Sequence, residues 1–387
     1  MERKTGLIKQ KITALYAKIP YSLKIAILIA LIAKLAVFIL GYASAYTTAI
    51  SQGASTEPLG LLMTQFAKWD SPHYMYLAQN GYVNSGDPAN FIVFFPLYPF
   101  LVRLITFDFA YVNLSGLIVS NVSSIFAVVY LFKLVKLDFS DSVAKKAVLF
   151  LCVFPTAYFL SAVFTESLFL ALVVASLYYA RGGKWCLAGV LGFLAALSRI
   201  AGLILLPVLA VEFLYQKKWR IRSSDLKLYW AGLPAFGFVV YLVINYVVTG
   251  GFFTFMEIER VHWFQTLDPV GGLAGALSWA VSRSFLDSLT MGYAQVVFAF
   301  LGLLMVLLAY RFKLRPSYQV YMLFTWVLAV STGFWISIPR YVLVMFPMFI
   351  VLALISDKKP VRVAIFTVSS VTLVFFTWLF ATGAWAF

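Results

Sequence analysis

Residues 22–46 read SLKIAILIALIAKLAVFILGYASAY, an apolar run interrupted only by Lys24 and Lys34. A helix of about 25 residues is long enough to cross a hydrocarbon core of roughly 30 Å. A secretory signal core is shorter, about 7–15 residues. We therefore expect a retained first span, although 43–45 (ASA) resembles a signal-peptidase site. Lys34 is expected to face a neighbouring helix or to extend toward the headgroups.

The composition of the whole chain extends this conclusion. It is 63% hydrophobic and 12% charged, whereas a soluble domain carries about 25% charged residues. The net charge of +15 comes from basic clusters between apolar runs, as the positive-inside rule describes. That distribution favours orientation signals and contact with anionic lipid headgroups over nucleic-acid binding. The two cysteines, Cys152 and Cys186, imply neither a disulfide framework nor a cysteine metal site.

The chain is predicted to be an all-α polytopic membrane protein, organised as one transmembrane domain over residues 1–387. Apolar runs bounded by charges or turn residues predict about eleven transmembrane helices. They lie near 22–46, 112–135, 146–162, 165–181, 185–199, 200–215, 228–249, 291–310, 317–335, 339–356 and 361–384.

The basic residues predict a cytoplasmic N-terminus. Nearly all Lys and Arg then fall in or beside the inner segments 1–21, 136–145, 182–184, 216–227, 311–316 and 357–360. Six basic residues fall on the outer side: Lys68, Arg103, Arg199, Arg260, Arg283 and Arg340.

Two long outer segments remain, 47–111 and 250–290. We expect surface helices in the first segment. One is predicted to begin at Ser71-Pro72, a good helix-start pair, and 94–106 is a second surface helix or a re-entrant segment. The second segment is the expected place for acceptor selection.

A short outer motif carries the chemistry: Trp69-Asp70-Ser71-Pro72-His73-Tyr74. On a helix, Asp70 and His73 share a face, so Asp70 is the leading candidate for a general base and His73 for its support. The alternative is that Asp70 only caps the helix. An ion-coupled transporter would place its charges near the bilayer midplane, whereas here they gather at the outer boundary, as for an enzyme at the lipid–water interface.

Three further outer residues are candidates. Glu166 lies at a hairpin tip and either caps the next helix, pairs with Arg199 or supports the site. Arg199 and Arg340 suit a phosphate-bearing substrate, since guanidinium groups bind phosphate through a planar fork, unless they only extend to the headgroups. His262-Trp263 is a weaker candidate for lining the site.

Several kinds of motif are missing. The sequence contains no Walker motif, no glycine-rich dinucleotide loop, no His/Asp cluster with metal spacing and no Asp-x-Asp in the outer segments. This argues against a nucleotide-sugar enzyme that holds its donor through a metal. A donor that arrives in the membrane with its own phosphate fits better.

The order of the motifs resembles the PIG-V family, which contains GPI mannosyltransferase 2 and prokaryotic relatives. The motifs that carry this resemblance lie at 69–74 (WDSPHY), 94–99 (FFPLYP), 165–169 (TESLF), 198–199 (SR) and 338–341 (IPRY). It spans about 65 to 350, and the compact chain favours a prokaryotic relative in the plasma membrane; a eukaryotic one would lie in the endoplasmic reticulum.

The resemblance implies a GT-C glycosyltransferase fold with its active site in the first outer segment. It implies a polyprenyl- or dolichyl-phosphate-linked sugar donor, here mannose, and an inverting transfer to a hydroxyl of a glycolipid, glycan or protein. The hypothesis is a single displacement with Asp70 as the base. Arg199 or Arg340 stabilises the leaving phosphate, and no metal or other cofactor is required. Trp69, Tyr74 and Tyr98 would shape the sugar or prenyl pocket.

Three alternatives remain open. A lipid-linked sugar flippase would line a central path with charges and do no chemistry. A GT-C enzyme could move a different sugar, because only the resemblance indicates mannose. A membrane binding protein without catalysis is disfavoured by the intact motif around Asp70.

Overall fold

A computed structural model describes residues 19–220 and 225–387. Within these ranges the protein is helical and contains no strand, apart from an isolated antiparallel bridge between Leu267 and Thr332. The predicted basic cluster ahead of the first span lies outside the described residues. The prediction of an all-α fold is confirmed.

The first half of the chain forms long helices separated by short helical turns. These elements are α2 (Tyr21–Ser51), α3 (Pro58–Thr64), α4 (Ser71–Asn80), η1 (Asp87–Val93), α5 (Leu97–Ile105), η2 (Phe109–Tyr111), α6 (Val112–Val135), α7 (Asp141–Cys152), η3 (Ala157–Leu160), α8 (Glu166–Arg181) and α9 (Trp185–Ser198).

The second half continues in the same manner. Its elements are η4 (Ile200–Ile204), α10 (Leu205–Gln216), η5 (Leu226–Gly232), α11 (Leu233–Thr249), α12 (Thr254–Val261), α13 (Pro269–Ser282), α14 (Phe285–Asp287), η6 (Ser288–Tyr293, π-helical), α15 (Ala294–Arg311), α16 (Pro316–Val330), α17 (Ile338–Leu343), α18 (Pro347–Ile355) and α19 (Lys359–Thr382).

The described helices include five stretches long and apolar enough to cross a membrane: 21–51, 109–135, 226–249, 285–311 and 359–382. The bent pair η1 and α5, which meet at 111°, would make a sixth. The other predicted runs are helical too, but they form helices shorter than the roughly 20 residues that a perpendicular span needs. The protein is an integral membrane protein, and the count of eleven spans stays a prediction.

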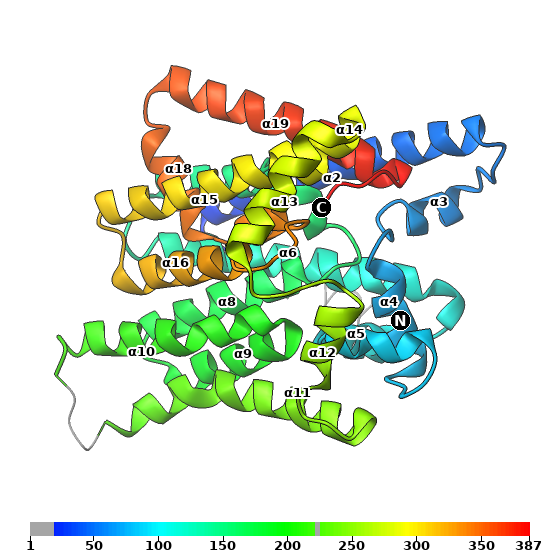
Figure 1. Ribbon diagram of the computed structural model, residues 1–387. Helices are drawn as coiled ribbons and strands as arrows, with labels where there is room; N and C mark the ends of the chain where they lie inside the picture. Colours follow the sequence, from blue (N-terminus) through cyan, green and yellow to red (C-terminus); the bar gives the residue numbers. More distant parts are fainter. Residues whose placement is uncertain (1–18, 221–224) are drawn as a thin grey trace, which may run out of the picture.

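Helix α8 lies at the centre of the bundle, packed mainly between α6 and α9 (Figure 1). Nearly all its residues are buried, as expected for a helix that is apolar on every side. At 1.5 Å per residue it is roughly 24 Å long. Its first residue, Glu166, and its last, Arg181, each join a network of ion pairs. The helix therefore connects two polar clusters through an apolar core.

The first outer segment folds as short helices, in agreement with the sequence. Figure 1 shows α3, α4 and α5 at one side of the bundle, with α12 from the second outer segment near α5 and away from α3. The predicted second element of this segment is α5, bent sharply against η1, and α12 packs on η1. The two outer segments thus meet over the end of the bundle that carries Asp70.

Candidate functional site

Asp70 precedes the first turn of α4 but does not cap it. Its side chain makes no cap hydrogen bond; instead, Oδ2 accepts a hydrogen bond from Nη1 of Arg340 at 3.1 Å. The preceding residue, Trp69, has a φ of 59°, a conformation uncommon for a bulky residue. The alternative that Asp70 merely caps the helix is therefore excluded. The side chain keeps 27% of its surface exposed, so the second carboxylate oxygen is available to another group.

The start of α4 is fixed to a buried connection between η3 and α8. The Ser71 hydroxyl, which the sequence suggested as a cap, donates to the carbonyl of Val163 at 3.0 Å. The amide of Val163 donates to the carbonyl of Phe66 at 2.9 Å. Asp70 is thereby held over the residues that lead to Glu166.

Arg340, on α17, is shared between two carboxylates. In addition to its bond to Asp70, its Nε and Nη2 each lie 2.9 Å from Oε1 of Glu166. Its guanidinium carbon lies 4.9 Å from the ring centroid of Phe159 and 4.7 Å from that of Phe164, within cation–π range. Arg340 is 7% exposed. Its donors are engaged by protein groups, so its geometry suits the orientation of Asp70.

Glu166, the first residue of α8, is fully buried. Its Oε1 accepts hydrogen bonds from Arg199 and Arg340, which confirms the expected structural pairing with Arg199. Its Oε2 has no hydrogen-bond partner among the described residues. A buried carboxylate oxygen without a partner is costly, and a catalytic or ligand-binding role is one of the explanations for such an exception.

Arg199 leaves the end of α9 in an extended conformation. Its Nη1 donates to Oγ1 of Thr165 at 3.0 Å and to Glu166, and its guanidinium carbon lies 5.5 Å from the ring of Tyr341. The chain then folds back on α9 at Gly202, where a Cβ would lie 2.3 Å from the backbone nitrogen of Ala196. In the described structure Nε and Nη2 of Arg199 bond to no protein group, so this guanidinium has donors to offer a ligand.

His73 lies in an aromatic enclosure beside this ion network. Its ring centroid is 4.3 Å from Phe91, 5.2 Å from Phe94 and 5.5 Å from Trp263. Burial lowers the pKa of His73 below its ordinary value, which favours a neutral imidazole. Trp263 thus lines this region from the second outer segment, as predicted, and the ring of His262 lies edge-on to Trp263 at 5.0 Å.

The three remaining aromatic candidates lie at different depths. Tyr74 packs edge-on against Tyr98 at 5.3 Å, and burial raises its pKa well above the ordinary value. Tyr98 is fully buried beneath it and donates to the carbonyl of Gly116 at 3.0 Å. Trp69 is 36% exposed and lies edge-on against Trp385 at 4.7 Å. Tyr74 therefore borders the ion network, Tyr98 supports it from below, and Trp69 lies at the rim.

The motif residues Asp70, Glu166, Arg199 and Arg340 thus form one continuous ion network, although up to 270 positions separate them. A family model described as Mannosyltransferase (PIG-V) matches residues 19–229. The chain belongs to this family. The matched part contains the first three of these residues. The protein is accordingly an integral membrane protein of the PIG-V mannosyltransferase family.

Among solved structures the protein is similar to the Archaeoglobus fulgidus oligosaccharyltransferase. With that enzyme tethered to an acceptor peptide containing the NVT sequon, the identity is 13% and the TM-score 0.47, covering 90% of this chain and 55% of that one. With the apo form, the identity is 13% and the TM-score 0.45, covering 91% and 56%. The PIG-V protein thus spans about half the length of these structures. No curated protein matches it significantly.

A carboxylate that the sequence did not single out also faces the site. Glu259, on α12, is partly buried and interacts electrostatically with Asp70; burial and then the Asp70 charge raise its pKa to about 7. The only sequence signal was its position shortly before His262-Trp263. In this PIG-V protein a third carboxyl group, besides Asp70 and Glu166, therefore interacts with the network from the other outer segment.

An open cavity of about 730 Å³ lies against α12, the helix that carries Glu259. It lies between η1, the end of α11 and α12, and the residues that line it include Asn84, Ala89, Tyr246 and Ile258. Its volume is in the range of pockets for small ligands, roughly 300–1,000 Å³. Ile258 precedes Glu259 directly, so one short helix borders both the cavity and the Asp70 region. Within the described residues, no group of three or more His, Cys, Asp or Glu side chains is arranged to hold a metal ion.

Proposed function

We propose that this PIG-V protein transfers mannose from a polyprenyl-phosphate or dolichyl-phosphate donor to an acceptor hydroxyl, with inversion at the anomeric carbon. One observation carries the proposal. Asp70 is a partly exposed carboxylate that Arg340 holds through one oxygen, in a network where Arg199 retains unbonded N–H groups. This combination offers a proton acceptor and an anion-binding group in the same place.

In the proposed step, the acceptor oxygen attacks the anomeric carbon of the donor sugar. The bond between that carbon and the phosphate oxygen breaks, and the phosphate leaves with the electron pair. Asp70 accepts the proton from the attacking hydroxyl. The transition state has oxocarbenium character, as in glycoside hydrolysis.

The two arginines take different parts in this proposal. Arg199 faces the leaving phosphate, where preorganised donors stabilise developing charge. Arg340 is a positioning residue, because its donors are already bound to Asp70 and Glu166. The sequence allowed either arginine to bind the phosphate. In this proposal Arg199 binds it, and Arg340 orients the base. No metal or other cofactor takes part in this scheme.

The other site residues have supporting parts. Tyr74 and Trp69 border the sugar, Tyr98 supports Tyr74 from below, and Trp263 with His262 closes the side toward the second outer segment. His73, neutral and enclosed by rings, shapes the pocket beside Asp70.

We propose that this site lies on the extracytoplasmic face, because the basic residues predict a cytoplasmic N-terminus. A prokaryotic plasma membrane is proposed separately, because the compact chain resembles the prokaryotic relatives. The acceptor, a glycolipid, glycan or protein, would approach through the cavity beside α12. The residues that line this cavity include Asn84 and Tyr246, which are of types that can bind sugar hydroxyls.

Purified protein in nanodiscs, supplied with radiolabelled polyprenyl-phosphate mannose and a panel of acceptors, tests the proposal. We expect wild type to transfer the label and Asp70→Asn to be about 10²–10⁴-fold slower, the contribution typical of a general base. Equal rates in both would remove Asp70 from the mechanism. In protein reconstituted into sealed vesicles instead, label that crosses the membrane without reaching any acceptor would favour a flippase. Transfer from a different lipid-linked sugar would replace mannose as the donor sugar.

A further inference from the structure

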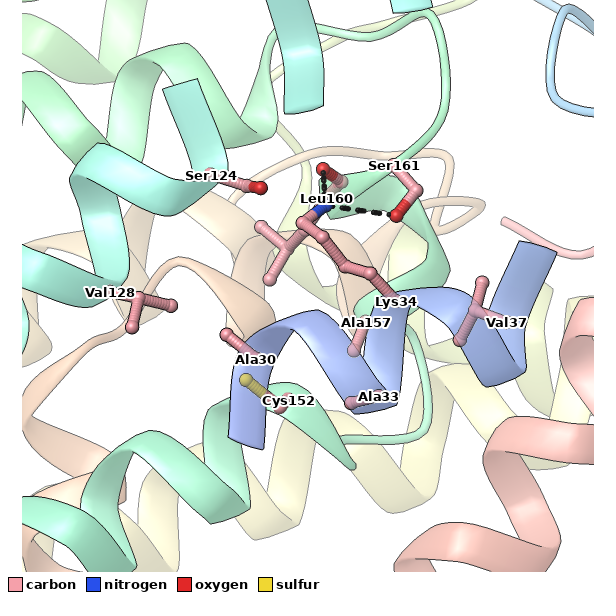
Figure 2. Close-up of a pocket in the computed structure, with 10 residues that line it drawn as sticks. All are labelled: Ala30, Ala33, Lys34, Val37, Ser124, Val128, Cys152, Ala157, Leu160 and Ser161. Carbon is pink, nitrogen blue, oxygen red and sulfur yellow. Dashed lines mark hydrogen bonds between the residues drawn. The ribbon is translucent and has the colours of Figure 1, made fainter. Parts of the chain in front are cut away.

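Lys34 lies in the middle of α2, within a stretch long enough to cross the membrane. A cation inside a membrane-spanning helix is costly unless protein groups surround it. Figure 2 shows the Lys34 side chain directed away from α2 toward Leu160 and Ser161, not along the helix toward a membrane surface. The alternative that Lys34 faces a neighbouring helix is therefore the correct one.

All three donors of an ammonium group find acceptors around Lys34. Nζ lies 2.8 Å from Oδ1 of Asn121 on α6, 3.0 Å from the carbonyl of Leu160 and 3.0 Å from Oγ of Ser161. Nδ2 of Asn121 in turn donates to the carbonyl of Ser161 at 3.2 Å. Lys34 and Asn121 together hold the beginning of the connection between η3 and α8.

We define residues 160–166 as the site floor, because this buried connection carries the groups that organise the site. The carbonyl of Val163 accepts the Ser71 hydroxyl beside Asp70. The ring of Phe164 lies against Arg340, and Glu166 binds both arginines. A displacement at the start of the site floor would therefore reach each charged residue of the ion network.

We propose that Lys34 is a positioning residue for glycosyl transfer, acting through the site floor on Glu166 and its two arginines. This rests on the function proposed above. The surroundings explain why loss of the ammonium would leave three acceptors without a donor. The cavity around Lys34 measures about 20 Å³ and is lined mostly by apolar groups, including Ala30, Val37 and Cys152. That is room for about one water molecule. One water has two donor hydrogens, so it cannot satisfy the three acceptors that surround Lys34.

The first test is a double-mutant cycle on transfer rate in nanodiscs. We expect Lys34→Met, which keeps the length but removes the donors, to lower kcat at least 10-fold, and Lys34→Arg to restore it to within about 3-fold of wild type. In a Glu166→Gln background, Lys34→Met should cost less than 2-fold more, because residues that act through one element are not additive. Ser124→Ala is the matched control. It changes the same cavity, but its hydroxyl bonds only to the Asn121 carbonyl of its own helix, so we expect wild-type rates.

The second test needs no substrate. We expect Lys34→Met to speed amide hydrogen exchange in peptides covering the site floor, while peptides from α10 exchange as in wild type. Unchanged exchange, or an equal loss of kcat from Lys34→Met in both backgrounds, would overturn the proposal. If wild type transferred no mannose, the proposed donor would fail, and the exchange result would still show whether Lys34 holds the site floor.

Discussion

The two ends of α8 carry two ion networks of similar composition. They differ in saturation, that is, in how many of their hydrogen-bonding atoms have a partner. The Asp70 network at its first residue consists of Asp70, Glu166, Arg199 and Arg340. The Glu212 network at its last residue consists of Asp138, Arg181, Glu212 and Arg315. Each network contains two carboxylates and two guanidinium groups.

In the Glu212 network, every carboxylate oxygen has a partner. Arg315 binds Glu212 through two bonds of 2.7 Å, one to each oxygen, and Ser317 and Gln216 donate to it at 2.8 and 2.6 Å. Arg181 binds Asp138 through two further bonds of 2.7 Å. Such paired, parallel bonds are the most specific geometry of arginine and carboxylate.

The Asp70 network lacks this saturation. Glu166 keeps one buried oxygen without a partner, and Asp70 keeps one oxygen unbonded, among the residues described. Arg199 likewise leaves Nε and Nη2 without a protein partner in the described structure. Because buried polar groups are normally satisfied, the saturated network fits a role in fastening helices, and the unsaturated one fits the ligand-binding role proposed above.

The largest effect is expected where the saturated network is broken. Glu212→Gln keeps the shape of the side chain but removes the charge that holds Arg315, and we expect the protein to lose about 3–5 kcal/mol of stability, as when one partner of a buried pair is removed. Activity per folded molecule should stay within about 3-fold of wild type. Thermal unfolding in detergent and transfer assays measure the two quantities.

Lys136→Ala is the matched control, because Lys136 pairs with Asp141 at the protein surface, where both side chains are at least 40% exposed. We expect no measurable change from it, since exposed pairs contribute little. If Glu212→Gln lowered the transfer rate more than the unfolding midpoint explains, the division between a fastening and a ligand-binding network would be wrong.

The next effect is expected in the unsaturated network. Arg199→Gln should lower the transfer rate about 10²–10³-fold, the cost of losing one preorganised donor at a developing charge. The unfolding midpoint should change less than in Glu212→Gln, because Glu166 keeps its bonds to Arg340. A variant that unfolds early but transfers mannose at the wild-type rate would assign Arg199 to the structure alone.

The helices of this protein could be predicted well from its sequence. The apolar run at 112–135 is α6 (Val112–Val135), and that at 165–181 is α8 (Glu166–Arg181). The number of spans could not be predicted in the same way. A helix such as α8 is apolar because protein surrounds it, and its sequence pattern does not distinguish this from contact with lipid.

The site residues were predictable in part, for a physical reason. Charges are so costly in an apolar chain that Asp70, Glu166, Arg199 and Arg340 stand out, and all four meet in one network. Which group pairs with which is decided by packing between elements far apart in the sequence. The double pairing of Arg340 therefore could not be predicted from any local pattern.

The smallest effect concerns the third carboxylate, Glu259, which faces Asp70 and forms no ion pair within the described ranges. Its pKa is raised to about 7, from an ordinary value near 4.3. The folded protein therefore holds this proton more tightly than the unfolded chain. The stability this contributes is fully present below about pH 4.3 and is lost as the pH rises through about 7.

Glu259→Gln should remove this dependence, so the difference between the unfolding midpoints of the variant and the wild type should grow in favour of the variant from pH 5 to pH 8. Arg260→Ala is the control on the same helix, since Arg260 is exposed and pairs only with Glu257. If the variant and wild type gave parallel curves, Glu259 would not interact with Asp70, and the Asp70 network would end at its four residues.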